Sequence, residues 1–261
     1  GRVLIVGLFT SVNGTSRGGI ARLTVDGSVD TSFMNGLSGA DGEVRAVAVD
    51  LTSGANYGKI YVAGDFNNVN GVPRSRVARL NTDGSVDTGF VPRLADGVTV
   101  ATLNGAVRAL AIDSNGDLYI GGDFTGFTGR QRIAKLSAAS GAPAPGALDA
   151  SFLATAGDGF DSFVSSLAVQ SVRLFNGSLE DRLLVGGGFS TFTKSSLAVT
   201  RNGFARIGTL AGAGSIDPEV NFGTGANGQV NAVGVQGDGR LVVAGAFTAF
   251  NGTDRKSTRL N

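Results

Sequence analysis

Short apolar runs recur along the chain, and each ends where a glycine or a polar turn residue interrupts it. One of them, residues 44–49, alternates bulky Val with small Ala and carries a single charge, Arg45. Both faces of such a run are apolar, whereas a sheet with one solvated face alternates apolar with polar residues. No segment keeps a period of 3.6 residues, so the pattern predicts β-strands covered on both faces and almost no helix.

A Gly-x-Phe motif follows one apolar run in every repeat and sets the period of the chain. It occurs at Gly7-Leu8-Phe9, Gly64-Asp65-Phe66, Gly122-Asp123-Phe124, Gly187-Gly188-Phe189 and Gly245-Ala246-Phe247. Consecutive phenylalanines of the motif are 57 to 65 residues apart. Self-similarity at a fixed period is typical of repeat architectures. The sequence therefore predicts a tandem repeat with a unit of about 57–65 residues.

Two further motifs share this period and lie downstream of the glycine. An apolar-Ala-basic-apolar run recurs at 20–23, 77–80, 133–136 and 204–207, and a Gly-x-x-Asp stretch at 27–33, 84–90, 146–152 and 214–220. Asp-Gly and Asn-Gly pairs between the runs tolerate the positive φ of tight hairpin turns. Each unit is thus predicted to hold three clear strands and a fourth that is a short outer strand or an edge loop.

The length of the unit favours one blade of a β-propeller. A seven-stranded sandwich needs about 100 residues, whereas a four-stranded blade takes about 40–50, to which longer turns add. Small residues in the run at 44–49 suit the innermost strand, where blades crowd toward the axis. We place the Gly-x-Phe strand next to it and the Ala-basic strand outside that. We expect an all-β propeller, or a fragment of one, made of four-stranded antiparallel blades with almost no helix.

The innermost run marks where each blade begins. Residues 1–261 then form a single propeller, interpreted as a fragment, with a partial blade at 1–43, blades at 44–106, 107–163 and 164–229, and a partial blade at 230–261. We expect further blades of the same parent chain as neighbours, although the partial ends could instead close a small ring. The tail Lys256–Asn261 has lost the apolar pair of its strand, so it is either a degenerate strand or a cloning or assembly artefact.

Composition excludes several kinds of chemistry. The chain contains no His and no Cys, which excludes Ser-His-Asp and Cys-His catalysis, disulfides and thiolate metal sites. Its formal net charge is +1 and its basic residues are spread out, so no nucleic-acid surface is expected. Its apolar runs are too short to span a membrane. We predict no cofactor and no catalytic residue.

Carboxylates that recur once per repeat are the first candidate site. Each is expected to pair with the basic residue of its own repeat: Arg22 with Asp30, Arg79 with Asp87, Lys135 with Asp149, and Arg206 with Asp217. A feature present in every blade is interpreted as scaffold, and a ring of cation-binding carboxylates is the alternative.

Two other groups of acidic residues are weaker candidates. Asp113, Asn115 and Asp117 have the oxygen density of a calcium loop but lack its spaced ligand series, so a hairpin turn is the favoured interpretation. Asp65 and Asp123 could act as a carboxylate pair from adjacent blades. Other repeats have Leu, Gly or Ala at that position, which indicates a tolerant turn position instead.

The motifs are clearest between Asn56 and Phe90, where Gly-x-Phe is followed by Asn-Gly, Ala-Arg-Leu and Asp-Gly-Ser-x-Asp-x-x-Phe. In these features, over essentially its whole length, the chain resembles the delta-60 repeat family, bacterial β-propellers of unassigned function. The resemblance implies a large surface or secreted bacterial protein with many repeats and no catalytic residue set. Departures from the pattern are a linker at 91–106, an insert at 137–145, and a loosened fourth unit with Pro218 and Val220.

We therefore expect a non-catalytic scaffold that binds an unknown protein or glycan outside the cell or in the cell envelope. The binding loops would be those that break the repeat, namely Val91–Ala106, Ser137–Ala147 and Asp158–Phe163. The alternative is a carbohydrate-active propeller enzyme, which needs two carboxylates about 5–9.5 Å apart in one cleft.

Overall fold

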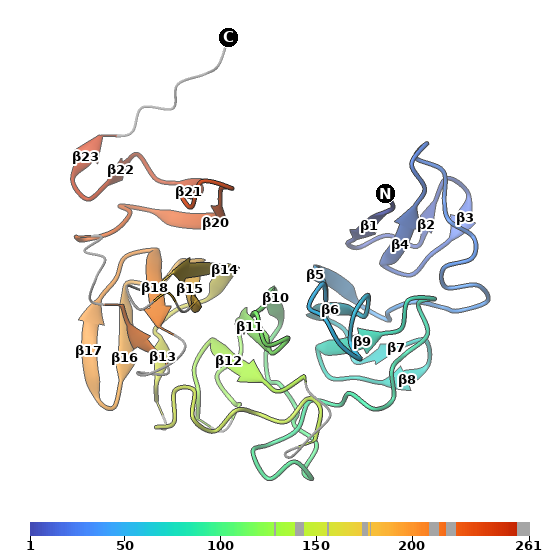
Figure 1. The fold of residues 1–261 in the computed structure, drawn as a ribbon, viewed down its shortest axis with the longest axis horizontal. Helices are drawn as coiled ribbons and strands as arrows, with labels where there is room; N and C mark the ends of the chain where they lie inside the picture. The colour runs from blue at the N-terminus through green and yellow to red at the C-terminus, as the bar shows by residue number, and fades with distance from the viewer. Residues whose placement is uncertain are drawn as a thin grey trace. The chain divides into compact units, whose positions relative to one another are not determined.

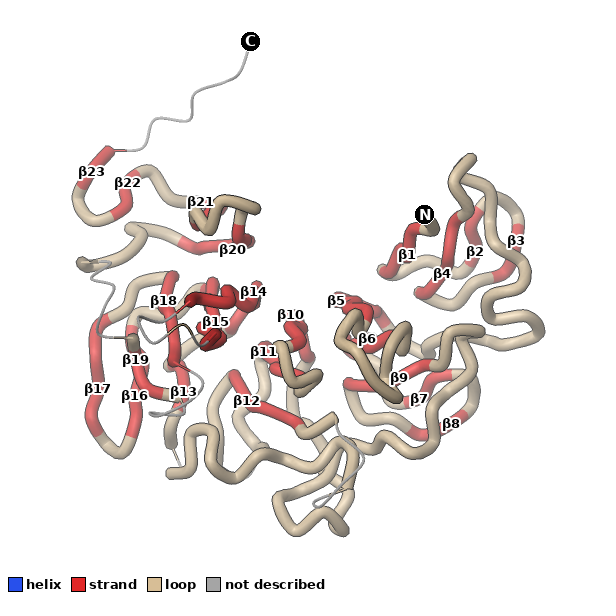
Figure 2. Tube along the Cα trace, viewed as in Figure 1, coloured by secondary structure: helices blue, strands red, loops and turns tan. Residues whose placement is uncertain are grey.

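The computed structural model describes residues 1–127, 129–138, 144–155, 157–173, 177, 179–208, 214–217 and 223–254. All regular structure in these residues is β-strand (Figure 2). Within the same ranges there is no helix of the length and apolar character needed to cross a membrane. The chain divides into two compact units, residues 1–120 with 135–149, and residues 121–134 with 150–261.

The second repeat, in the first unit, shows the plan of the sheets (Figure 1). The strands β5 (Glu43–Val49), β6 (Ile60–Asp65) and β9 (Val77–Leu80) form one sheet in that order, with antiparallel neighbours. Between β6 and β9 the chain forms a separate hairpin, β7 (Asn68–Val69) with β8 (Val72–Pro73). The predicted order of the three main strands is confirmed, and the hairpin is an addition that the sequence analysis did not foresee.

The other repeats of the first unit vary this plan. The first repeat pairs β1 (Val3–Val6) with β4 (Ile20–Leu23) and has the hairpin β2 (Ser11–Val12) with β3 (Thr15–Ser16). The third repeat has the sheet β10 (Val107–Ile112), β11 (Leu118–Gly122) and β12 (Ile133–Leu136), through which the division between the two units runs.

The fourth and fifth repeats lie in the second unit. The fourth has the sheet β14 (Val164–Arg173), β15 (Leu179–Gly187), β18 (Phe204–Gly208) and β19 (Ser215–Ile216), and its hairpin β16 (Thr191–Lys194) with β17 (Leu197–Thr200) is joined by β13 (Gly159–Phe160). The fifth has the sheet β20 (Gln229–Val235) with β21 (Leu241–Ala246) and the hairpin β22 (Ala249–Phe250) with β23 (Thr253–Asp254).

A blade of four strands is complete only in the fourth repeat of the described chain. In the first three repeats the fourth strand is reduced to a single bridge: Leu23 with Val29, Leu80 with Val86, and Leu136 with Leu148. The reason is visible at Asp30, whose carboxylate accepts the backbone N–H of Ser32 and so turns the chain away after one pairing. The fourth segment is thus a short outer strand in one repeat and an edge segment with a single bridge in three others, which are the two alternatives that the sequence leaves open.

The glycine of Gly-x-Phe lies where two backbones approach too closely for a side chain. The first strand shifts register between Val44 and Ala46 opposite this glycine, as at a β-bulge. A Cβ on Gly64 would lie 2.0 Å from the carbonyl oxygen of Glu43. The phenylalanine that follows, Phe66, is fully buried. In this motif the glycine permits the close approach of two backbones, and the phenylalanine packs in the core.

The core lies between neighbouring sheets. In the first unit Phe33 and Met34 of the first repeat pack with Val44, Val62 and Leu80 of the second repeat in one buried cluster. Strand β5, the first strand of the second repeat, lies against β1 of the first repeat and β10 of the third repeat. Burying a side chain of this size contributes about 1.5–3 kcal/mol. For β5, this packing confirms the prediction that the strands are covered on both faces.

We predict that Gly64→Ala lowers the free energy of unfolding by about 1–3 kcal/mol, because the new Cβ overlaps the carbonyl of Glu43. Urea unfolding followed by circular dichroism measures the change. The control is Gly234→Ala in β20, where a Cβ meets nothing within 4 Å and where the second repeat already has Ala48. An equal loss in both variants would contradict the close-approach explanation.

Candidate functional site

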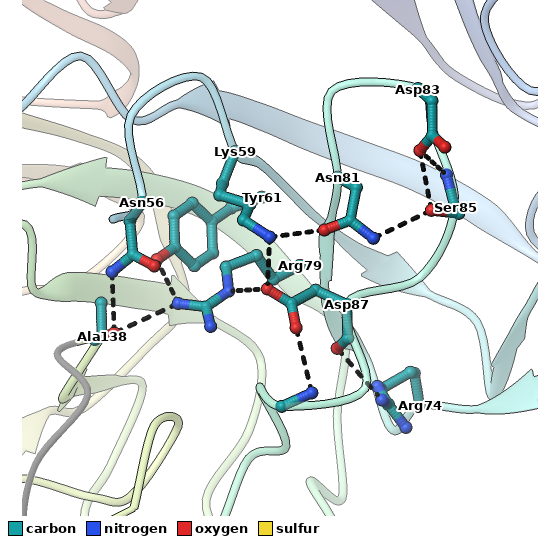
Figure 3. Close-up of polar contacts among 11 residues, drawn as sticks. Asn56, Lys59, Tyr61, Arg74, Arg79, Asn81, Asp83, Ser85, Asp87 and Ala138 are labelled. Atoms are coloured by element: carbon teal, nitrogen blue, oxygen red, sulfur yellow. Dashed lines mark hydrogen bonds and ion pairs between the residues drawn. The ribbon is translucent and has the colours of Figure 1, made fainter. Parts of the chain in front are cut away.

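The recurring carboxylate of the second repeat, Asp87, lies between two cations (Figure 3). The Nε of Arg79 donates to Oδ2 of Asp87 at 2.9 Å, and the Nζ of Lys59 lies 3.0 Å from the same oxygen. Burial by itself would raise the pKa of Asp87, but the hydrogen bond from Lys59 and the charge of Arg79 outweigh it and lower the pKa. The carboxylate is therefore held ionised beside its partners.

The structure brings together both predicted members of each repeat pair. The N···O distances are 2.9 Å for Arg22–Asp30, 2.9 Å for Arg79–Asp87, 3.8 Å for Lys135–Asp149 and 2.7 Å for Arg206–Asp217. The last phenylalanine of the Asp-x-x-Phe stretch lies beneath the guanidinium, with Arg22 4.4 Å above the ring of Phe33 and Arg79 4.9 Å above that of Phe90. Basic residue, carboxylate and aromatic ring therefore form one small cluster in these two repeats.

Sequence analysis missed a second cation in this cluster. It is Arg2, 3.2 Å from Asp30, Lys59, 3.0 Å from Asp87, and Arg182, 3.0 Å from Asp217. Each stands five residues before the first glycine of its Gly-x-Phe motif. This constant spacing is the signal from which it could have been found.

The arginines also connect successive repeats of the first unit. Nη1 of Arg22 donates at 2.7 Å to the carbonyl oxygen of Thr82, and Nη1 of Arg79 donates at 3.1 Å to that of Ala138. Each acceptor lies two residues past the third strand of the next repeat. An ion pair that also bonds the next repeat serves the scaffold, which supports the structural interpretation over a cation-binding ring.

The third repeat has the opposite arrangement of charge. Asp117 stands where the first, second and fourth repeats have the second cation, and Nζ of Lys135 lies 3.0 Å from its Oδ2 and 3.1 Å from Oδ2 of Asp113. Oδ1 of Asp113 also accepts the backbone N–H groups of Asn115 and Asp117. Burial raises the pKa of Asp113.

The carboxylates of the calcium candidate therefore surround an ammonium group, and Asn115 contributes only its backbone N–H to Asp113. In the described part of the chain, no cluster of three or more His, Cys, Asp or Glu side chains is placed to hold a metal ion. The geometry here is that of a hairpin turn tied to Lys135.

Two equivalent clefts lie beside Gly-x-Phe, away from this charged cluster. One, of about 450 Å³, is lined by residues that include Leu8, Gly19 and Asp41 in the first unit. The other, of about 510 Å³, is lined by residues that include Gly188 and Gly203 in the second unit. Each is bounded by its own Gly-x-Phe segment, the start of its third strand and the start of the next repeat.

In the second and third repeats an arginine stands at the equivalent position before the third strand. Gly19, Arg76, Arg132 and Gly203 precede the third strand and share a left-handed φ of 67°, 66°, 70° and 67°. Nη1 of Arg76 pairs with Oδ1 of Asp65, and Nη1 of Arg132 donates to the backbone carbonyl of Asp123. The two clefts are thus found in repeats where glycine replaces the arginine. Asp65, one of the two carboxylates considered for catalysis, is engaged by Arg76.

The clefts contain few ionisable groups. Among the described residues that line them, Asp41 alone is ionisable. Its carboxylate accepts the backbone N–H groups of Asn67 at 2.8 Å and Asn68 at 3.0 Å, and the Asn68 side-chain amide at 2.7 Å. Asp41 therefore fixes the chain after Gly-x-Phe.

Two of the three segments that break the repeat are joined to each other. The N–H of Val91 donates to the carbonyl of Pro145 at 3.3 Å and that of Arg93 to the carbonyl of Gly146 at 2.9 Å. Arg93 and Ala147 also form a parallel bridge. Residues 139–143 of the second segment lie outside the described residues, as do Pro218, Val220 and the tail 256–261.

The third segment, Asp158–Phe163, is buried in its first half, where the expectation of a binding loop is wrong, whereas Asp161 is exposed. Asp158 and Phe160 are each 1% exposed. Gly159 and Phe160 form β13, which pairs with β16, and Oδ1 of Asp158 accepts the N–H of Ser195 at 2.6 Å. The segment departs from the repeat because it supports the longer hairpin of the fourth repeat.

We predict a pH-dependent effect of Asp30→Asn. Hydrogen bonding from Ser32 and the contact with Arg22 outweigh burial and lower the pKa of Asp30 from 3.8 to about 2. A carboxylate with a lowered folded pKa stabilises the protein above its unfolded pKa and loses this effect as the pH falls through the folded value. The stability difference between wild type and variant should be full at about pH 7 and shrink toward about pH 2 in urea unfolding. A difference that is independent of pH would contradict this role.

The left-handed arginines generate another prediction. Arg76→Gly removes an exposed ion pair, which contributes about 0–1 kcal/mol, and also removes left-handed strain of about 1–2 kcal/mol. Its stability should therefore lie within about 1 kcal/mol of wild type. Arg76→Ala keeps the strain and loses the pair, so it should be the less stable variant in urea unfolding. The reverse order would contradict the explanation.

Comparison with known proteins finds a family that three segments of the chain resemble. A family described as "Domain of unknown function (DUF5122) beta-propeller" matches residues 1–33, 58–90 and 236–259. These matches fall on the second and third strands of the first two repeats and on the second strand and hairpin of the fifth. No curated protein matches the chain. The protein is an all-β chain that is similar in these three segments to a β-propeller family of unknown function, and the resemblance to delta-60 repeats agrees with that.

Proposed function

We propose that the protein is a non-catalytic binding module that contacts a protein or glycan partner through the joined loops 91–106 and 144–147. The observation that carries the proposal is a pre-ordered hairpin in the first of these loops. Arg93 and Val100 form an antiparallel bridge, and the N–H of Leu94 donates to the carbonyl of Thr99 at 2.8 Å. At the hairpin tip, Val98 is 74% exposed.

The hairpin tip is stabilised by polar groups of the loop itself. The carboxylate of Asp96 accepts the backbone N–H groups of Val98 and Thr99 at 2.8 and 2.9 Å, and Nη1 of Arg93 donates to the carbonyl of Val98 at 2.7 Å. The side-chain hydrogen bond from Thr99, followed by these backbone bonds, lowers the pKa of Asp96. A loop ordered before binding loses little conformational freedom on binding, and an exposed apolar tip supplies contact area.

The rest of the charge distribution supports a binding role over catalysis. The repeated acidic residues are engaged by cations and backbone groups of the scaffold, as at Asp87 and Asp113. A carbohydrate-active enzyme would need two carboxylates about 5–9.5 Å apart in one cleft. The described lining of the two clefts offers Asp41 alone.

The cellular setting is part of the proposal. A surface or secreted location in a bacterium, with further blades of the parent chain as neighbours, rests on the resemblance to delta-60 repeats. The +1 net charge supports a partner other than nucleic acid.

The test is a binding screen with the purified protein against arrays of bacterial and host glycans and of peptides, read by interferometry. We expect at least one saturable ligand, with affinity that Val98→Asp lowers by about tenfold or more because a charge replaces the apolar contact. The matched control is Val25→Asp, at a turn position in the first repeat that is 81% exposed. Equal loss in both variants, or hydrolysis of a glycan by the wild type, would overturn the proposal.

A further inference from the structure

The hairpin of the fourth repeat differs from its counterparts. In the first, second and fifth repeats the hairpin strands are two residues long, whereas β16 and β17 have four residues each. Strand β13 pairs with the inner edge of β16, so β17 is left as the outer strand of this sheet. All four residues of β17 are exposed.

The register of the hairpin decides which backbone groups of β17 face outward. Lys194 pairs with Leu197 across a turn of two residues, Ser195 and Ser196, both with positive φ. In such a hairpin the closing pair exchanges its N–H and C=O bonds with each other, and the next pair does not. The N–H and C=O of Ala198 therefore point away from β16, toward the open edge.

A groove lies against one face of the same hairpin. It has a volume of about 300 Å³ and is lined by Phe192, Leu197 and Val199 from β16 and β17 and by Ile216 from β19. Leu197 is 74% and Val199 37% exposed. An added strand would place alternate side chains over this face, because residues i and i+2 of a strand point the same way.

The edge lacks the protections seen elsewhere in the chain. Strand β8 contains Pro73, which has no N–H to donate, and its partner strand is only two residues long. Strand β17 reads Leu-Ala-Val-Thr, with neither proline nor charge. A four-residue apolar edge of this kind readily accepts a further strand.

The charges around the edge indicate what kind of strand would fit. Lys194 lines the groove, where its Nζ donates to Oγ of Ser215 at 2.7 Å, and Arg201 follows β17 directly. Lys194 pairs with Leu197 at the turn end of β17, so the two cations lie at opposite ends of the strand. A carboxylate on the incoming strand would complement Arg201 at the end of β17 away from the turn. A second copy of β17 would instead bring another Lys194 and Arg201 to the same edge, which is unfavourable.

We propose that β17 binds an extended peptide segment of a partner by strand addition, and that this segment carries apolar residues at alternate positions and a carboxylate at one end. The backbone of Ala198 supplies the hydrogen bonds, the groove takes the apolar side chains, and Arg201 selects the acidic end. This surface lies in the second unit and is separate from the loops 91–106 and 144–147, so it does not depend on the function proposed for them.

The test uses a fluorescent eight-residue peptide of alternating valine and threonine with a glutamate at one end, and a matched peptide with lysine in place of glutamate. Fluorescence polarisation with the full chain should show saturable binding of the glutamate peptide, weakened by about tenfold or more for the lysine peptide. Hydrogen exchange at Ala198 should slow when the glutamate peptide is bound.

Two variants separate the edge from other surfaces. Ala198→Pro removes the outward N–H, and Leu197→Lys removes the apolar contact while leaving the backbone free to pair, so each should weaken binding by about tenfold or more. Val98→Asp, in the other surface, should bind the peptide unchanged, which keeps this outcome apart from that of the loop proposal. Circular dichroism checks that the variants fold.

Three results would overturn the proposal: no binding of the glutamate peptide, equal binding of both peptides, or binding that neither edge variant weakens. A concentration-dependent dimer in sedimentation that Leu197→Lys abolishes would assign the edge to a second copy and would also overturn it.

Discussion

The recurring aspartate of the Gly-x-x-Asp stretch is the group on which the architecture depends. Taking Asp87 or Asp217 out of water is costly unless cations and hydrogen bonds replace the lost hydration. Both are held between a basic residue of the third strand and the second cation, which stands five residues before Gly-x-Phe. One ionic contact thus fixes three segments of a repeat. In the first unit the arginine also donates to a carbonyl of the next repeat, which makes the contact a link in the chain of repeats.

Variation among the repeats changes the charge cluster and the Gly-x-Phe end but leaves the pairing of the main strands intact. The third repeat has Lys135 in place of arginine and Asp117 in place of the second cation, so its cluster contains one cation and several carboxylates. Strands β10, β11 and β12 still form the same sheet. At the Gly-x-Phe end, the left-handed position before the third strand is occupied by Arg76 in one repeat and Gly203 in another. The backbone conformation is the same at both positions, and a cleft lies beside Gly203.

The two proposed binding surfaces lie outside the repeated charge cluster. The recurring carboxylates are engaged by the basic residues of the scaffold, so they offer little to a partner. The pre-ordered hairpin around Val98 and the open edge of β17 are both additions to the repeat, and both expose apolar side chains over ordered backbone. Rigid elements that project from a stiff scaffold are well suited to recognition, because little conformational freedom is lost on binding.

The sequence by itself determined the repeat, the absence of helix in the described residues, the order of the three main strands and the partner of each recurring carboxylate. These follow from patterns that lie within about 60 residues, such as alternating apolar positions and the spacing from Arg79 to Asp87. The second cation, Lys59, could also have been predicted, because it stands at a constant spacing before Gly-x-Phe.

Only the tertiary structure decided the features that depend on contacts between repeats or on backbone direction. The carbonyl of Ala138 accepts a hydrogen bond from Arg79. Every residue has a backbone carbonyl, so the sequence does not indicate which one will be the acceptor. The break in the repeat predicts a binding loop at Asp158–Phe163, yet Asp158 and Phe160 are buried because β13 pairs with β16. The outward-facing groups of Ala198 depend on the pairing register, since a shift of one residue would turn them inward.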